Sequence, residues 1–421
     1  MSSEWSECSL GDLIDIKHGF AFSGDYISKN QGKFVLVTPG NFEIGGGFKE
    51  GSAKYFHSQY PEEYVFSPGD LVVTMTDLSK TADTLGYSAK IPGEKGKTYL
   101  HNQRVGKVSS KSSDAELDFL YWVMRHTDYR RWVLSTATGS TVKHTSPSRI
   151  LDYTFLLPPL PEQQAIAHIL GTLDDKIELN RKTNETLEAM AQALFKSWFV
   201  DFDPVRAKAE GRPTGLPDEI SDLFPDSFED SELGEIPSGW KVSSLGEEFQ
   251  WKEGKPWVKE DRVDFSANLV FGANGSIGYS TRQIANTRVI FVGKIGSCGA
   301  INFYNGSFWA TNNTHYLTLE DNSDLEYIRQ VLLGVDFSAY VGGSSNPYMP
   351  FGNFAQHQIA SPPSRIISKY CEEVSPARSR IEQNTTESSL LSFLRDALLP
   401  KLISGEIRIP DAERLLEEVG V

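Results

Sequence analysis

Several short segments of the chain bring amide, hydroxyl and cationic side chains close together. Such side chains anchor phosphates and read base edges, with Arg or Lys suited to guanine and Asn or Gln to adenine. We expect most of these segments to lie on a face that contacts DNA. The residues selected on this basis are Thr74, Thr76, Lys80, His101, Asn102, Gln103, Arg104, Lys107, Ser140, Lys143, His144, Lys255, Lys294, Ser297, Asn312, Asn313, His315, Ser344, Ser345 and Tyr348.

The net charge of −15 argues against phosphate binding until its distribution along the chain is considered. Residues 95–149 carry ten Lys/Arg against four Asp/Glu, with aromatic residues interleaved. Residues 201–239 carry eleven Asp/Glu against three Lys/Arg, which accounts for eight of the fifteen net charges. An acidic total therefore does not exclude a basic face elsewhere.

Three segments resemble parts of enzymes, but none fits its motif. "GEKGKT", residues 93–98, ends like a phosphate-binding loop, but Ile91 stands where that loop needs glycine. "NPY", residues 346–348, lacks the second proline of the adenine methyltransferase motif, and "GANGSIG", residues 272–278, lies outside any strand-helix unit of nucleotide-binding type. We therefore expect no catalytic residue in this chain.

The histidines and cysteines show no metal-binding pattern. None of the eight histidines lies three to five residues from another, and Cys8, Cys298 and Cys371 are far apart. No apolar run reaches membrane-spanning length, and the N-terminus does not resemble a secretory signal. We expect a soluble cytoplasmic protein without a metal or a membrane anchor.

The elements that must position these residues are mixed. β-branched and aromatic runs such as "FVLVT" and "RVIFVGKIG" are broken by Gly, Pro, Asn and Ser, which predicts short strands. Each half of the chain adds one amphipathic helix, at about residues 118–134 and about 325–340. The fold class expected is α+β.

An internal repeat organises the chain. "KIELNRKTNETL", residues 176–187, returns as "RIEQNTTESSLL", residues 380–391, at an offset of 204. Gly139-Ser140 and Pro158-Pro159 recur at the same offset, and Trp5 with Leu10-Gly11 recurs at an offset of 235 as Trp240 with Leu245-Gly246. The two halves therefore begin and end alike.

The repeated segment has the period of a coiled coil, with apolar or small residues at alternating steps of four and three. The second copy is weaker, because Arg395 occupies a seam position and Pro376 is expected to kink or interrupt the helix. The predicted seam consists of Ile166, Leu170, Leu173, Ile177, Asn180, Asn184, Leu187, Leu194, Trp198, Val374, Ile381, Asn384, Leu391 and Leu398.

Two such helices can pair antiparallel within one chain, about a pseudo-two-fold axis. A helix over residues 162–199 is about 57 Å long at about 1.5 Å per residue, which exceeds one DNA turn of about 34 Å. Asparagine in an apolar seam costs stability but specifies register. The alternative interpretation is that Asn180, Asn184 and Asn384 are exposed positions beside the true seam.

The expected domains follow from these boundaries. Residues 201–239 are rich in Pro, Gly and acid, so we expect a partly ordered linker, with docking of a partner as the alternative. The expected divisions are a first globular domain 1–157, a helix 158–200, the linker 201–239, a second globular domain 240–361, a helix 362–407 and a tail 408–421.

A known family carries the same order of segments. "LLPPLPEQQAIAHILGTLDDKIELNRKTNETLEAMAQALFKSWF" resembles the central conserved region of the specificity subunit of type I restriction-modification enzymes, and "IEQNTTESSLLSFLRDALLPKLISGEI" resembles its C-terminal copy. "SPGDLVVTMTDLSKTADTLGYSAKI" with "YLHNQRVGKV" resembles one type of target-recognition domain of that family, and "ATNNTHYLTL" resembles a counterpart in another type.

The resemblance implies a non-catalytic, sequence-specific DNA-binding subunit. Each recognition domain would read one half of a bipartite asymmetric target, while the paired helices set the spacing and dock two adenine-N6 methyltransferase subunits. S-adenosylmethionine would belong to those partners, and ATP with Mg to a further restriction and translocase subunit, leaving this chain without a cofactor. The alternative is a coiled-coil scaffold with two β-rich modules that bind protein or glycan.

Overall fold

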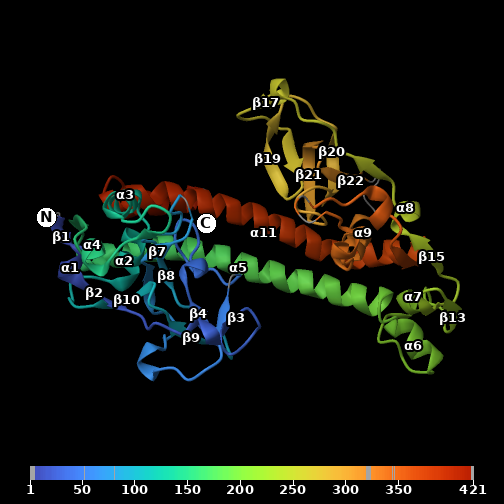
Figure 1. Cartoon of the computed structure of the whole chain (residues 1–421), viewed down its shortest axis with the longest axis horizontal. Coiled ribbons are helices and arrows are strands. Elements are labelled where there is room, and N and C mark those ends of the chain that lie inside the picture. The colour runs from blue at the N-terminus through green and yellow to red at the C-terminus, as the bar shows by residue number, and fades with distance from the viewer. Residues whose placement is uncertain are drawn as a thin grey trace. The chain divides into compact units, whose positions relative to one another are not determined.

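The computed structural model describes residues 5–51, 53–79, 81–318, 324–343, 345 and 347–418. The chain forms two compact units, unit 1 (residues 1–180 and 386–421) and unit 2 (residues 181–385). Each unit includes part of both long helices, α5 (Leu160–Phe199) and α11 (Ser364–Ser404), as Figure 1 shows. Helices and sheets are mixed in both units, in agreement with the expected α+β class.

The strands of unit 1 form small sheets. One has the order β2-β10-β6-β8 and another the order β3-β5-β4-β9, while β1 pairs with β12 and β7 with β11. The strands are β1 (Ser6–Ser9), β2 (Ile14–His18), β3 (Ile27–Ser28), β4 (Phe34–Val37), β5 (Lys54–Phe56), β6 (Leu71–Thr74), β7 (Thr76–Asp77), β8 (Ser88–Lys90), β9 (Thr98–His101), β10 (Val105–Ser110), β11 (Lys143–His144) and β12 (Thr154–Leu157).

One expected helix in unit 1 is divided into two. α2 (Leu117–Val123) ends before α3 (Thr127–Thr136) begins, because the His126 side chain accepts a hydrogen bond from the Asp128 backbone N–H and caps a new helix. The remaining helices of unit 1 are α1 (Leu10–Leu13), α4 (Pro147–Leu151) and α12 (Ile409–Glu418). α12 lies in the expected tail, and its Ala412 is fully buried.

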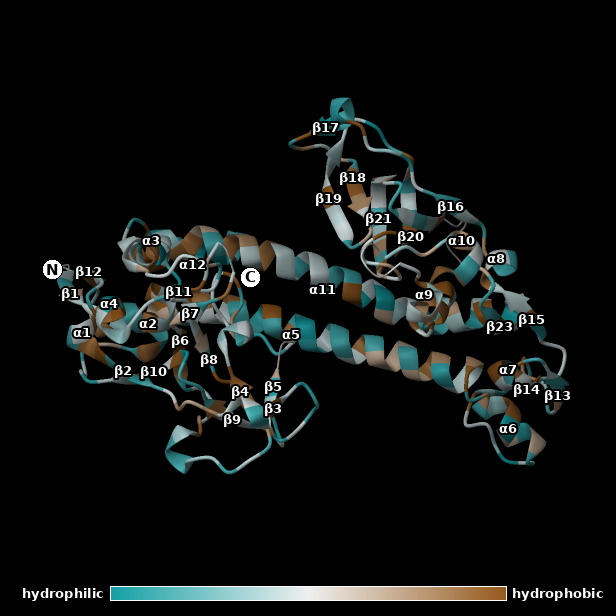
Figure 2. Ribbon diagram, in the orientation of Figure 1, coloured by the Kyte–Doolittle hydropathy of each residue, from teal (hydrophilic) through white to brown (hydrophobic). Residues whose placement is uncertain are grey.

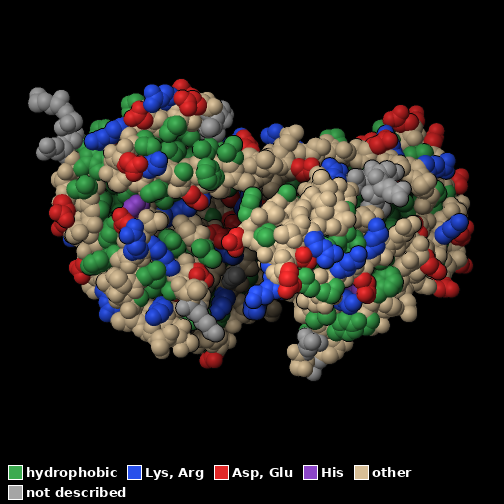
Figure 3. All heavy atoms as spheres, turned by 90° about the horizontal axis from the view of Figure 1, so that it is seen from above, with side chains coloured by type: hydrophobic (Ala, Val, Ile, Leu, Met, Phe, Trp, Pro, Cys, Tyr) green, Lys and Arg blue, Asp and Glu red, His purple; other side chains and the backbone are tan. Residues whose placement is uncertain are grey.

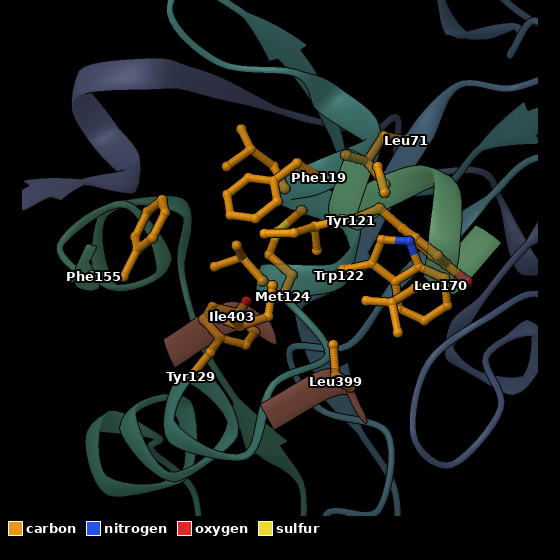
Figure 4. Packing of buried hydrophobic residues seen from close by; sticks show 14 of the residues in the cluster. Leu71, Phe119, Tyr121, Trp122, Met124, Tyr129, Phe155, Leu170, Leu399 and Ile403 are labelled. Carbon is orange, nitrogen blue, oxygen red and sulfur yellow. The ribbon is translucent and has the colours of Figure 1, made fainter. Parts of the chain in front are cut away.

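The main core of unit 1 joins its sheet to both long helices. Figure 4 shows Leu170 of α5 and Leu399 and Ile403 of α11 around the aromatic side chains of α2, including Phe119 and Trp122. Burial of this apolar surface contributes roughly 25 cal/mol per Å². The long-helix residues therefore form part of the core of this domain.

A seven-stranded sheet dominates unit 2, with the order β16-β22-β20-β21-β18-β19-β17. Two antiparallel pairs, β13 with β14 and β15 with β23, lie outside it. The strands are β13 (Phe228–Ser231), β14 (Gly234–Pro237), β15 (Lys241–Ser244), β16 (Trp251–Glu253), β17 (Arg262–Val263), β18 (Leu269–Gly272), β19 (Gly275–Ser280), β20 (Ala285–Gly293), β21 (Ile301–Ala310), β22 (Thr314–Thr318) and β23 (Gln358–Ser361).

The helix expected at about residues 325–340 is shorter in the structure. α9 (Leu325–Leu333) ends where the poor helix former Gly334 follows, and a separate 3-10 turn occupies Phe337–Tyr340. The other helices of unit 2 are α6 (Asp203–Ala209), α7 (Asp218–Ser221), α8 (Leu245–Glu248) and α10 (Phe351–Phe354).

Residues 201–239 differ from the partly ordered linker that we expected. They form α6, α7, β13 and β14, and they contribute Val205, Ile220, Phe224 and Ile236 to the main core of unit 2. Our expectation rested on the many acidic residues of this segment and overlooked these few apolar side chains. Their burial is sufficient to pack the segment against the domain.

Both long helices alternate hydrophobic and hydrophilic residues along their length (Figure 2). In unit 1, Asp174 of α5 pairs with Arg395 of α11, and Asn180 Nδ2 donates to Glu387 Oε2 at 2.8 Å. In unit 2, Asn384 Nδ2 donates to Asn184 Oδ1 at 2.8 Å. In unit 2, Glu188 of α5 also pairs with Arg378 of α11. Within each unit, later residues of α5 therefore contact earlier residues of α11.

We expected Pro376 to kink or interrupt α11, and the structure shows that it does not interrupt the helix. The helix continues from Ser364 to Ser404, and Pro376 occupies an exposed position within it. A proline removes one backbone N–H and leaves the carbonyl four residues earlier without its helical partner. Because Glu372 is also exposed, water can hydrogen-bond to that carbonyl.

Candidate nucleic-acid interface

The selected segments of unit 1 meet at one end of its β2-β10-β6 sheet. Residues Gln103 and Arg104 form the turn that leads from β9 into β10. The backbone N–H of Phe20 donates to His101 O at 2.8 Å, and that of Met75 donates to Arg104 O at 3.0 Å. The turn is therefore fixed between the segment that follows β2 and the one that follows β6.

The pairing of β7 with β11 brings a third selected segment, which contains Lys143 and His144, to the same end of the sheet. Thr76 pairs with His144 in register, and Thr76 Oγ1 lies 3.2 Å from His144 Nδ1. The backbone N–H of Thr145 donates to Met75 O at 3.0 Å. Three segments that are far apart in sequence thus converge.

The segments of unit 2 meet in the corresponding way around the turn Asn312–Asn313. The backbone N–H of Lys255 donates to Ala310 O at 2.8 Å, and that of Lys294 donates to Asn313 O at 2.8 Å. β16, β22 and β20 here occupy the positions of β2, β10 and β6 in unit 1.

The strand registers match between the two units. In unit 1, β10 residue Gly106 lies opposite His18 and Val73; in unit 2, β22 residue His315 lies opposite Glu253 and Val292. This shared arrangement of three strands and a turn is hereafter the reading frame. The two units contain it with different side chains.

The repeat offset extends into the reading frame. The N–H of Met349 donates to Lys294 O at 2.9 Å, as that of Thr145 does to Met75 O. An isolated bridge joins Ile295 to Tyr348, the position 204 residues after His144. Equivalent backbone contacts have therefore persisted where the sequences have diverged.

A glycine permits the close backbone approach in each frame. A Cβ added at Gly19 would lie 2.3 Å from Asn102 O, and one added at Gly254 would lie 1.9 Å from Thr311 O. Both distances are far below van der Waals contact, so only glycine fits. Gly19 and the neighbouring Phe20 were absent from our selection, although the offset of 235 relates Gly19 to Gly254 in "KEGKPW".

Several side chains that we selected as DNA contacts are buried, so they are not accessible for direct contact. Some of these side chains bond to the backbone of the frame, as when His101 Nε2 donates to Val105 O at 2.9 Å. Burial also lowers the pKa of His101 to about 4, so its ring is neutral at pH 7. We had selected these buried residues as DNA contacts, but each is at most 9 % exposed: Thr74, Thr76, His101, Asn102 and His315.

The other selected side chains remain accessible. Two of the lysines already have acidic partners, Lys107 with Asp70 and Lys294 with Glu253. Lys80 and Ser344 lie outside the residues that the structure describes. The exposed positions are Gln103, Arg104, Ser140, His144, Lys255, Ser297, Asn312, Ser345 and Tyr348, and the partly exposed ones are Lys107, Lys143, Lys294 and Asn313.

Charge of both signs is distributed over the surface, as Figure 3 shows, with Lys and Arg gathered in a band on the visible face of unit 2. Within the described ranges, no group of His, Cys, Asp and Glu has the arrangement of a metal site. The helices among those residues include none long and apolar enough to cross a membrane.

Two of the three seam asparagines are buried, Asn180 at 3 % and Asn384 at 1 % exposure, whereas Asn184 is partly exposed. Asn180 and Asn384 therefore face the partner helix and are not exposed positions beside the seam. The buried seam residues are Ile166, Leu170, Leu173, Asn180, Trp198, Val374, Asn384, Leu391 and Leu398, and the partly exposed ones are Ile177, Asn184, Leu187, Leu194 and Ile381.

In each unit, one carboxylate of α5 forms ion pairs both with α11 and with the globular part of that unit. In unit 1, Asp174 pairs with Arg395 of α11 and, at 2.7 Å, with Arg125 at the end of α2. In unit 2, Glu188 pairs with Arg378 of α11 at 2.8 Å and with Arg329 of α9. Burial raises the pKa of Glu188, but the two arginines more than offset this and lower it to about 2.

Comparisons with known proteins agree with this architecture. Residues 2–189 match the type I restriction modification DNA specificity domain. The chain is 25 % identical to the type I restriction enzyme HindI specificity subunit of Haemophilus influenzae, over 96 % of this chain and 100 % of that protein. It is 26 % identical to the MjaIX specificity subunit of Methanocaldococcus jannaschii, over 70 % of each.

A solved structure shares the fold. The type I restriction-modification S subunit from M. genitalium superposes with a TM-score of 0.57 at 17 % identity, over 95 % of this chain and 96 % of that one. The match covers nearly the whole of both chains.

Proposed function

The chain belongs to the family of type I restriction enzyme specificity subunits, and we propose that it reads a bipartite DNA target through one reading frame in each unit. Its own role is non-catalytic, as that of a specificity subunit is. The observation that carries the proposal is the duplicated frame, whose exposed side chains are of the types that read bases and anchor phosphates.

The two frames present different side chains, so each would read a different half-target. In this proposal residues 1–157 form the first recognition domain and residues 240–361 the second. A symmetric dimer requires equal half-sites, because its two reading surfaces are identical. A single chain with two unequal frames can bind an asymmetric target.

The long helices would set the distance between the half-targets. We propose that α5 and α11 pair antiparallel as a coiled coil, with the domains related by a pseudo-two-fold axis. The order of contacts within each unit supports this pairing, because later residues of α5 meet earlier residues of α11. The buried asparagines would specify the register.

Partners would supply the chemistry. Two adenine-N6 methyltransferase subunits would dock on the helices and bring S-adenosylmethionine, and a restriction and translocase subunit would bring ATP and Mg. This chain would hold no cofactor and act in the cytoplasm. The proposal assigns target choice to this chain and catalysis to its partners.

Duplex binding tests the function against the scaffold alternative. The purified chain, alone and with a co-purified methyltransferase, should retain a subset of duplexes from a random library. Its affinity should fall steeply with salt, because log K decreases by about 0.9 per phosphate contact for each unit of log salt. Sequence-independent retention, or retention insensitive to salt, would contradict the proposal.

A further inference from the structure

The geometry points to one pair of turn residues in each unit as the specificity-determining pair, Gln103 and Arg104 in unit 1 and Asn312 and Asn313 in unit 2. The inference rests on the proposed function and makes it specific. It concerns which side chains meet base edges, among the many polar side chains at the interface.

The first step is the exposure of each turn between neighbours that are buried. His101, Asn102 and Val105, which flank the first turn, are buried, whereas Gln103 and Arg104 are exposed. In unit 2 the flanking Ala310, Thr311 and Thr314 are likewise buried, while Asn312 is exposed and Asn313 partly so. Each turn therefore offers polar side chains outward from a buried backbone.

The second step is the rigidity of the turn backbone. Asn102 Oδ1 accepts from the backbone N–H of Arg104 at 3.0 Å, and Arg104 O accepts from the N–H of Met75 at 3.0 Å. In unit 2, Asn313 O accepts from the N–H of Lys294 at 2.8 Å. A fixed backbone lowers the entropy cost of placing a side chain on a base.

The third step is chemistry. Arg offers two parallel donors that match guanine O6 and N7, and Asn or Gln offers a donor and an acceptor that match adenine N6 and N7. Among the described residues Arg104 has no ion pair, unlike Lys107 and Lys294, whose charges are compensated. We expect guanine and adenine in the half-target of unit 1, and adenine at two positions in that of unit 2.

Exchanging the turns tests the inference. Random duplexes retained by the immobilised full-length chain are sequenced for the wild type, for Arg104→Ala, and for the double variant Gln103→Asn with Arg104→Asn. Arg104→Ala should lower the preference for one guanine by about 5- to 150-fold. The double variant should replace that guanine with adenine, and the other half-target and the spacing should stay the same.

Arg131→Ala provides the matched control, because Arg131 is an arginine of the same unit whose side chain is 78 % exposed, on α3. It should leave the enriched sequence unchanged. If the double variant fails to fold, the result for Arg104→Ala tests the inference instead. This substitution should leave the turn intact, because the hydrogen bonds of Arg104 in the turn are made by its backbone atoms.

The outcomes separate this inference from the proposed function. A wild-type chain that enriches no sequence would overturn both. A wild-type target that Arg104→Ala leaves unaltered would overturn only the assignment of the turn. Equal weakening of all duplexes by Arg104→Ala would make Arg104 a phosphate contact and would likewise overturn the assignment.

Discussion

Each reading frame contains a close backbone approach at a single glycine, Gly19 in unit 1 and Gly254 in unit 2. Gly254 lies so near Thr311 that a methyl group must displace one of the two strand ends. The second turn follows directly on this contact, since the neighbouring Lys255 N–H donates to Ala310 O.

We predict that Gly254→Ala lowers the free energy of unfolding by about 1–3 kcal/mol, the usual cost of overpacking. Gly352→Ala is the control, since a Cβ there meets nothing within 4 Å and the residue lies in α10. Its effect should stay within about 0.5 kcal/mol. Urea unfolding of both variants measures the difference, and equal stability of the two would contradict the account.

Glu188 makes a second residue-scale prediction, which concerns pH. Its pKa is about 2 in the folded chain against 4.5 ordinarily, so its contribution to stability is present above pH 4.5. That contribution disappears as the pH falls toward 2, because the carboxylate is then protonated in both states.

Glu188→Gln should therefore destabilise the chain at pH 7 by about 1.5–3 kcal/mol, the range for hydrogen bonds to charged groups. The deficit should shrink as the pH is lowered through the acidic range. Chemical unfolding of the wild type and the variant across that range measures it. A deficit independent of pH would show that the arginine pairs do not cause it.

At the scale of elements, the long helices contain polar residues where apolar ones would pack better. Asn180 and Asn384 are buried, and their side-chain amides donate to Glu387 and Asn184. Such a position selects one register at the expense of stability.

Replacing both Asn180 and Asn384 with Leu should raise the thermal midpoint and loosen the register. The spacing between the two halves of the DNA target should then become heterogeneous. The pair Leu179→Ala and Met190→Ala serves as a control, because both side chains are exposed on α5, at 57 % and 62 %. A double leucine variant with unaltered spacing would discard this role for the asparagines.

The sequence predicted these helices well because their period is regular over many residues. Both long helices, and the burial of Asn180 and Asn384, followed from the repeat. Pro376 was misjudged because a proline at an exposed position need only lose one hydrogen bond. Residues 201–239 were misjudged because composition outweighed a few well-placed apolar side chains.

The reading frames were predicted only in part. Their segments were selected from side-chain chemistry, which cannot separate buried His101 and His315 from exposed Arg104 and Asn312. The frame itself is made of backbone hydrogen bonds, which different sequences can form equally well. Its one direct sequence signal is the glycine at an offset of 235.

At the scale of the whole molecule, one chain contains two unequal reading frames. In the proposed function, the duplicated frame lets one polypeptide present two different sets of base-reading side chains. The long helices contribute to the cores of both units, and in the proposed function they would relate the two half-targets.

The most direct test is to sequence the methylated adenines in cells that carry this chain together with its modification partner. The account predicts one asymmetric target in two separated parts, methylated only when this chain is present. Methylation at a single uninterrupted palindrome, or an unchanged pattern when the chain is deleted, would contradict it.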